Sequence, residues 1–329
     1  MSLSKIYYLC SSLLLFLSAF VFLSPGLISP DMIYPKRIDS VYIELHDVKF
    51  AGEIVSKQTS EDETKLFNPL SLGIPYTEFK VVSDDALQID CWFIPVEDSA
   101  ANTIVLLHDL NESKILYLEH IKQFHDRGLN VCAVDLRAHG KSEGLEFSAG
   151  LPSVRDIKLI LDQLLSDGKS GRIILYGKGT GAAIAIQVAV YDGRCDALIL
   201  QNPMKNFNTY LNRYSHEKWG IMQFVWKPVF RREVEKLLEY SIKDLNLTEM
   251  AAYTKIPSLF ISDSDDRFTF TTEILSIYDS SAASRKSLFL VREAADEEEN
   301  GAGYFNRITE FINKAIPRKP SVSRYKKLA

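Results

Sequence analysis

The hydrophobic pattern of the chain becomes regular from Tyr76 onward. Residues 77–83 and 87–95 alternate apolar and polar side chains around Asp84 and Asp85, which predicts two antiparallel strands joined by a turn. The apolar runs that follow lack a polar face, as is typical of strands covered on both sides. These runs occupy residues 103–108, 130–136, 172–176, 196–202, 256–262 and 287–291.

Segments with helical spacing separate these runs. Residues 113–128 and 153–168 each end at a glycine, and Ser153 is the predicted N-cap of the second segment, with Gly168 as its stop. Residues 179–191 predict a helix of small side chains. This alternation of strand and helix predicts an α/β fold, with a mostly parallel central sheet covered by helices on both faces.

After residue 30, the chain divides into three parts on this pattern. Residues 31–74 are a predicted linker and lead-in, residues 75–316 the α/β domain, and residues 317–329 a basic, solvated tail. Within the domain, the aromatic-rich residues 203–250 break the alternation, and we interpret them as a mostly helical cap insertion over the end of the sheet. Its aromatic side chains either form a small core of their own or line a pocket or a partner site.

The first thirty residues have a different character. Residues 6–23 carry no charge, and this length lies between a signal-peptide core and a membrane span. Because no clear cleavage site follows, residues 1–30 predict an uncleaved signal anchor in preference to a cleaved signal peptide. We expect a membrane-anchored or exported protein with its N-terminus inside and its domain outside, although Lys5, Lys36 and Arg37 give little charge asymmetry.

Composition restricts the function classes. The chain has 329 residues, is 46% hydrophobic and has a formal charge of -5, which allows a large core and argues against nucleic-acid partners. Its cysteines match no zinc or redox spacing, and Cys91 and Cys132 lie in apolar runs, so we expect buried thiols. The four cysteines are Cys10, Cys91, Cys132 and Cys195.

A glycine-rich stretch, ILYGKGTGAAIA at residues 174–185, is the most informative local motif. It is not a P-loop, because Lys178 precedes Gly179 instead of a Ser or Thr. Gly177, Gly179 and Ala182 fit the dinucleotide pattern G-x-G-x-x-A, but the next strand ends in Gln and Asn where that pattern needs an acid.

The same stretch also fits a nucleophile elbow, G-x-S-x-G, with glycine in place of the serine. Gly177 and Gly181 would let the strand and helix approach closely, and Gly179 would occupy the central place. That place normally has positive φ, which costs an ordinary residue about 1–3 kcal/mol, and glycine avoids most of this strain.

Three other segments support this third interpretation. LLHDL (106–110) stands where an oxyanion turn is expected, and IPSLFISDSDD (256–266) resembles a strand that presents an acid. DLRAHGKSEG (135–144) closely resembles the pattern D-x-R-G-H-G-x-S-x-G, and with it the chain resembles the α/β-hydrolase superfamily, in particular its membrane-anchored, serine-aminopeptidase-like or lysophospholipase-like members. The residues that match this pattern are Asp135, Arg137, His139, Gly140, Ser142 and Gly144.

The resemblance implies a catalytic triad in the order serine, acid, histidine. The corresponding places hold Gly179, Asp266 and Asp296, so the nucleophile and the histidine are both substituted. No histidine lies beyond His216, which excludes a base from the usual C-terminal loop. Thr180 follows the nucleophile place, but we expect its side chain to point away from the elbow.

The oxyanion turn is altered as well. Its remnant consists of His108, Asp109, Leu110 and Thr180, and Asp109 stands where the family has glycine. A carboxylate at this place would repel a developing oxyanion. The resemblance implies mainly structural roles for His108 and His139.

These changes predict a membrane-associated α/β-hydrolase-fold protein that lacks serine-hydrolase catalysis and binds a small ligand or a protein. The alternatives are an active hydrolase of esters or peptides that uses His139, Ser142, Thr180 and Asp266, and a dinucleotide-binding protein; whether the chain is an enzyme stays open. We expect no cofactor and no metal, because the acidic turn around Asp263 and Asp266 lacks the ligand spacing of a known loop.

Overall fold

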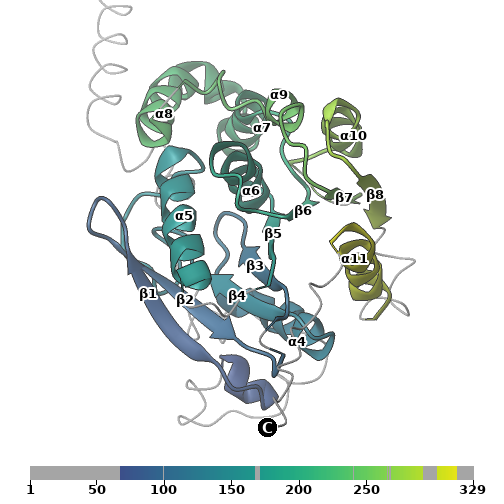
Figure 1. Cartoon of the computed structure of the whole chain (residues 1–329). Coiled ribbons are helices and arrows are strands. Elements are labelled where there is room, and N and C mark those ends of the chain that lie inside the picture. The colour runs from purple at the N-terminus through teal and green to yellow at the C-terminus, as the bar shows by residue number, and fades with distance from the viewer. Residues whose placement is uncertain are drawn as a thin grey trace, which may run out of the picture.

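The chain forms an eight-stranded sheet between two layers of helices (Figure 1). The computed structural model describes residues 67–98, 100–166, 171–239, 241–264, 266, 268–291 and 302–316. The predicted anchor in residues 1–30 and the predicted tail at 317–329 lie outside the described residues. Within those that are described, no helix is both long enough and apolar enough to cross a bilayer.

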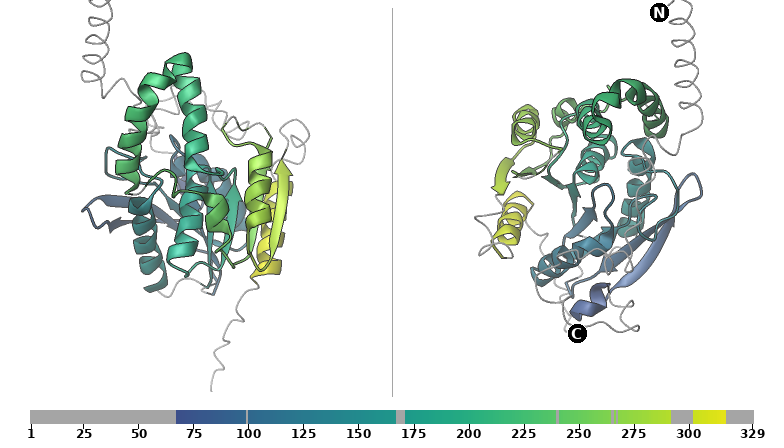
Figure 2. Two further views of the ribbon diagram at one scale, coloured as in Figure 1. Left: turned by 90° about the horizontal axis from the view of Figure 1, so that it is seen from above. Right: turned by 180° about the vertical axis from the view of Figure 1, so that it is seen from behind.

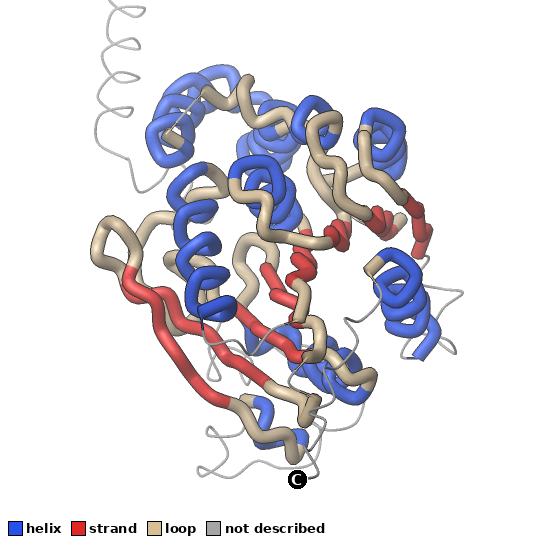
Figure 3. The backbone as a smooth tube through the Cα atoms, viewed as in Figure 1, coloured by secondary structure: helices blue, strands red, loops and turns tan. Residues whose placement is uncertain are grey.

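The strands follow the order β1-β2-β4-β3-β5-β6-β7-β8 across a twisted sheet (Figure 3). β2 pairs antiparallel with β1 and β4, and all pairs from β4 to β8 are parallel, which confirms the predicted sheet. The strands are β1 (Thr77–Val82), β2 (Gln88–Ile94), β3 (Thr103–Leu107), β4 (Asn130–Val134), β5 (Ile173–Lys178), β6 (Ala197–Gln201), β7 (Ser258–Asp263) and β8 (Lys286–Val291).

Each face of the sheet buries its own apolar cluster, because successive side chains of a strand point to opposite faces. Val105 and Leu107 of β3 belong to one cluster, and Ile104 and Leu106 belong to the other. On the first face lie α5 (Leu151–Ser166), α6 (Thr180–Tyr191), α9 (Leu247–Ala251) and α10 (Thr271–Ser280); on the second lie the short η3 (Pro69–Leu72) and η4 (Lys114–Tyr117), α4 (Leu118–Asp126) and α11 (Ala302–Ala315). The three described cysteines are buried and free, as expected for Cys91 and Cys132.

The insertion after β6 forms a helical hairpin. It consists of α7 (Phe207–Trp219), the short η5 (Gly220–Met222) and α8 (Gln223–Leu238), and it projects from the body of the domain (Figure 2). Tyr214 of α7 stacks on Phe230 of α8 with ring centroids 6.0 Å apart. The predicted helical insertion is therefore present, but its buried aromatic side chains Phe207, Tyr210 and Phe230 belong to the apolar cluster on the first face of the sheet and do not form a separate core.

One predicted helix boundary is wrong. Helix α5 begins at Leu151, so Ser153 lies in its first turn and is not the N-cap. Pro152 is tolerated there because the first helical N–H groups have no partner within the helix. The Ser153 hydroxyl donates to the carbonyl oxygen of Ser148, outside the helix.

Candidate functional site

The turn between β5 and α6 has the backbone of a nucleophile elbow. Gly179 has φ 53° and ψ -112° and caps α6, which begins at Thr180. A Cβ on Gly177 would lie 2.4 Å from the carbonyl oxygen of Gly181, and one on Gly181 would lie 2.2 Å from that of Leu107. These two glycines therefore allow α6 to pack directly against β5 and β3.

The side chain of Asp109 fills the place beside Gly179. Its Oδ1 atom accepts hydrogen bonds from the backbone N–H of Leu110 at 2.7 Å and of Thr180 at 2.8 Å. In an α/β hydrolase, the N–H after the nucleophile and an N–H from the loop after β3 form the oxyanion hole. A Cβ on Gly179 would lie 2.2 Å from the Asp109 carboxyl group, so this carboxylate occupies both the oxyanion hole and the space of a nucleophile side chain.

Two charged neighbours adjust the electrostatics of Asp109. Burial raises the pKa of Asp109 to about 6, the negative charge of Glu112 acts in the same direction, and Lys178 opposes both. Lys178 forms an ion pair with Glu112, whose other carboxylate oxygen accepts from the Asp109 N–H at 3.2 Å. Burial raises the pKa of Glu112, but the ammonium of Lys178 outweighs this and holds it below its usual value. This pair cannot be recognised in the sequence, because no spacing rule connects Glu112 with Lys178.

The residue at the acid place is held within its own turn. Asp266 Oδ1 accepts from the N–H groups of Phe268 and Thr269 at 2.8 and 2.6 Å, and Oδ2 accepts from the Asn202 side chain at 3.0 Å. None of these partners is a base. Asp296, at the histidine place, lies outside the described residues.

Both ring nitrogens of each of two histidines beside the site are hydrogen-bonded to backbone groups. His108 Nε2 accepts from the Leu136 N–H at 3.0 Å, so its Nδ1 carries the proton and donates to the Asp109 carbonyl oxygen at 2.7 Å. His139 Nε2 accepts from the Asn111 N–H at 3.2 Å, and its Nδ1 therefore donates to the Arg137 carbonyl oxygen at 2.9 Å. Burial lowers the pKa of His108, which keeps its ring neutral.

The loop that follows β4 is organised around Asp135. Asp135 accepts from the backbone N–H groups of Lys114 and Lys141, both at 2.8 Å, and from the Lys114 ammonium. Ser142 is fully buried, donates to the Asp135 carbonyl oxygen at 2.6 Å and accepts from the Asp90 N–H at 2.8 Å. Gly140 has φ 48°, and a Cβ there would lie 2.2 Å from the Asp135 carboxyl group.

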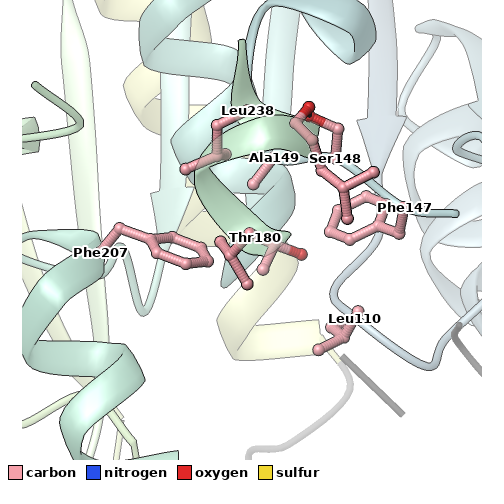
Figure 4. A pocket seen from close by; sticks show the side chains of 9 residues that line it. Leu110, Phe147, Ser148, Ala149, Thr180, Phe207 and Leu238 are labelled. Atoms are coloured by element: carbon pink, nitrogen blue, oxygen red, sulfur yellow. Dashed lines mark hydrogen bonds between the residues drawn. The ribbon is translucent and has the colours of Figure 1, made fainter. Parts of the chain in front are cut away.

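A small apolar cavity adjoins the two oxyanion-hole donors (Figure 4). Its volume is about 20 Å³, room for roughly one water molecule. Thr180 lines it, contrary to the expectation that this side chain points away, and the Thr180 hydroxyl donates to Asp109 Oδ1 at 3.0 Å. The lining residues are Leu110, Phe147, Ser148, Ala149, Thr180, Phe207, Val234, Leu237 and Leu238. The last three belong to α8, so the base of the hairpin closes this space.

The N-terminus of α6 is not open to a pyrophosphate. A dinucleotide would need the N–H groups that follow Gly179, but the first of them, on Thr180, already donates to the Asp109 carboxylate. A second negative group there would be repelled. Among the residues that the structure describes, no group of His, Cys, Asp and Glu side chains is arranged to hold a metal ion.

Known proteins resemble this chain in sequence. A family model described as serine aminopeptidase, S33, matches residues 98–254. An uncharacterized membrane protein of Saccharomyces cerevisiae is 24% identical over 224 residues, which cover 67% of this chain and 73% of that protein. An uncharacterized protein of Escherichia coli K12 is 25% identical over 191 residues, covering 54% of this chain and 66% of its own length.

Solved structures share the fold. An esterase of Pyrococcus furiosus superposes with a TM-score of 0.61 at 20% sequence identity, covering 75% of this chain and 95% of the esterase. The strand order, the elbow after β5 and the match to the serine aminopeptidase model agree. The chain therefore has the α/β-hydrolase fold, and its residues 98–254 are similar to the serine aminopeptidase, S33, family.

Proposed function

We propose that this α/β-hydrolase-fold protein does not catalyse hydrolysis and acts by binding a ligand or a partner protein. One observation carries the proposal: the Asp109 carboxylate accepts hydrogen bonds from both oxyanion-hole donors, beside an elbow residue without a side chain. Acyl transfer needs these donors to stabilise the negative oxygen of the intermediate. A resident carboxylate takes their hydrogen bonds, and its charge opposes a second anion.

The contacts of the residues considered as substitute catalytic groups add to this argument. Ser142 is buried with both of its hydrogen bonds used, and His139 uses both ring nitrogens. Asp266 is bonded to its own turn and to Asn202. Three of the four residues considered as substitute catalytic groups are therefore committed to other contacts.

The second candidate function is hydrolysis of esters or peptides by Thr180. It is favoured by the hydrogen bond from the Thr180 hydroxyl to Asp109 at 3.0 Å and by the position of Thr180 at the cavity. Asp109 would then act as the base. However, this carboxylate would have to leave the oxyanion hole before an intermediate could form, and leaving would break the contact that activates Thr180. We therefore place non-catalytic binding first.

We further propose that the protein is held at a membrane by residues 6–23, with its domain outside. The support is the uncharged run in the sequence, together with the printed name of the yeast relative, which calls that protein a membrane protein. Protease protection of sealed vesicles that contain the full chain would test this topology. An externally added protease should digest the domain only when the domain faces the protease.

Hydrolysis assays on the full chain in detergent micelles would test the main proposal. The substrates would be short and long acyl esters and a peptide amide, and the matched variant would be Thr180→Val, which removes the hydroxyl but keeps the shape. We expect no turnover above that of heat-denatured protein from either one. Turnover that Thr180→Val abolishes would establish the second candidate, and turnover that survives in Thr180→Val would contradict both assignments.

A further inference from the structure

The tip of the α7–α8 hairpin exposes apolar side chains to solvent. Ile221 is 84% exposed and Phe224 is 81% exposed, the highest values among the large hydrophobic residues that the structure describes. They lie three positions apart, in η5 and at the start of α8, where the hairpin projects farthest from the body (Figure 2). Large apolar side chains that gather in one exposed patch are typical of interaction sites.

The same segment is rich in basic residues. Residues 218–232 read KWGIMQFVWKPVFRR and contain four basic residues and no acidic one, in a chain whose formal charge is -5, and Glu217 and Glu233 flank them. Arg231 forms an ion pair with Glu235, which leaves Lys227 and Arg232 as the other described basic side chains. Two of the three tryptophans of the chain also belong to this segment. Of its basic side chains, Arg232 is exposed and Lys227 is half-buried.

We propose that this hairpin tip docks on the surface of a lipid bilayer that contains anionic lipids. Segments that combine exposed aromatic and aliphatic residues with Lys and Arg lie at the boundary between headgroups and acyl chains. Ile221 and Phe224 enter that boundary, and the basic side chains of Lys227 and Arg232 meet the lipid phosphates.

A second copy of the chain fits this surface less well. In a two-fold symmetric dimer the same patch meets itself, so the positive charges of the two segments would face each other. An anionic bilayer instead provides an acyl-chain region for the apolar side chains and negatively charged headgroups for the basic ones. The predicted anchor at residues 6–23 would keep the domain near a bilayer, and the hairpin tip would then fix which face approaches it.

Docking in this way also positions the cavity. Leu237 follows Phe224 by thirteen positions on α8, which corresponds to about 20 Å along the helix. The tip therefore contacts the bilayer while the cavity at the hairpin base stays above the lipid surface. The docking surface and the candidate site are thus separate, and each can be tested without the other.

Photocrosslinking in the full chain, reconstituted into vesicles, tests the proposal. A benzophenone side chain would replace Phe224 or, as a matched control, Tyr253, which is 75% exposed and lies outside the hairpin. The anchor is present in both proteins and contributes equally. We expect several-fold more lipid adduct from position 224 and a higher yield when phosphatidylserine is added to phosphatidylcholine. In the background Lys227→Gln/Arg232→Gln, the gain from phosphatidylserine should fall by roughly tenfold, because each basic residue near an anionic surface adds to the attraction.

Two results would overturn the proposal. Equal lipid adducts from positions 224 and 253 would mean that the tip does not dock, and adducts mainly between two protein chains would assign the surface to self-association. Hydrogen exchange gives an independent measurement, because vesicles should slow exchange at the tip in the native chain but not in Ile221→Ser/Phe224→Ser. Both native side chains are exposed, so the melting temperature of this variant should match that of the native chain.

Discussion

The loop after β4 and the turn after β5 reach the same edge of the sheet, yet they relate differently to the hydrolase pattern. The loop at residues 135–144 keeps the motif residues, and Asp135 and Ser142 bind neighbouring backbone groups. The turn keeps the elbow backbone at Gly179 but has no side chain at the nucleophile place. Asp109 accepts hydrogen bonds from the two N–H groups that would otherwise stabilise an oxyanion.

This difference separates two kinds of requirement. Asp135 and Ser142 of the loop are buried, so each needs its partners for the fold to be stable. The turn needs only a residue that tolerates positive φ and an acceptor for the first N–H groups of α6. Asp109 supplies that acceptor, so the domain can keep its fold without the chemistry.

The largest effect should come from breaking the buried charge network beside the loop. Arg137 binds Asp156 through two hydrogen bonds of 2.8 and 2.9 Å, and both side chains are buried. We expect Asp156→Ala to lower the free energy of unfolding by about 3–5 kcal/mol, because Arg137 would keep only its exposed contact to Asp85. Urea denaturation would measure this, with Asp162→Ala on the exposed side of α5 as the control. Equal losses in the two variants would contradict the role assigned to the network.

The next effect concerns the turn. We expect Gly179→Ala to cost about 2–4 kcal/mol, since the added Cβ meets both strained φ and the Asp109 carboxyl group. Gly220→Ala is the matched control, because Gly220 has φ 49° and ψ -125° with no heavy atom within 4 Å of a Cβ. The difference between the two losses isolates the clash, and Asp109→Gly in the Gly179→Ala background should recover part of it. If the two alanine variants lost the same stability, the carboxylate would not occupy the nucleophile space.

A pH-dependent effect distinguishes the turn from the loop. The pKa of Asp109 is raised from 3.8 to about 6, so the folded protein holds this proton at pH values where the unfolded chain has released it. The contribution of Asp109 to stability therefore falls as pH rises from about 4 to about 6 and stays low above that. The free energy of unfolding of the neutral variant Asp109→Asn, compared with that of the native chain, should therefore rise by up to about 3 kcal/mol as pH increases across this range. Thermal unfolding from pH 4 to 8 would measure the gain, and a constant difference between the two proteins would exclude a shifted Asp109.

The smallest effect should come from the exposed rim of the same loop. The side chain of Lys141 is 60% exposed, and it pairs with Glu78 at 2.8 Å. We expect Lys141→Ala to change the free energy of unfolding by less than about 1 kcal/mol, because water already solvates both charges. Denaturation at low and high salt would check this. A loss comparable to that of Asp156→Ala would mean that ion pairing, and not burial, makes the loop stable.

Local patterns were sufficient for the framework of this protein. Apolar runs predicted the strands from β3 to β8, and the alternation at residues 77–95 predicted the hairpin of β1 and β2. The glycine spacing also identified the elbow at Gly179, because close packing and positive φ restrict the residue type at each place. The start of α5 was misjudged at Ser153, since a serine near a helix start can cap it or bond to a preceding carbonyl with similar ease.

The sequence by itself determined the α/β framework and the glycine at the nucleophile place, because both follow from the pattern of neighbouring residues. It also determined the lack of a histidine beyond His216, which is a matter of residue type alone. Only the tertiary structure decided which side chain occupies the oxyanion hole and the space beside Gly179. Asp109 and Thr180 are 71 positions apart and meet because β3 pairs with β5 and Gly181 brings α6 close to both strands. The closure of the cavity by α8 depends in the same way on packing between distant segments, and no local pattern records such contacts.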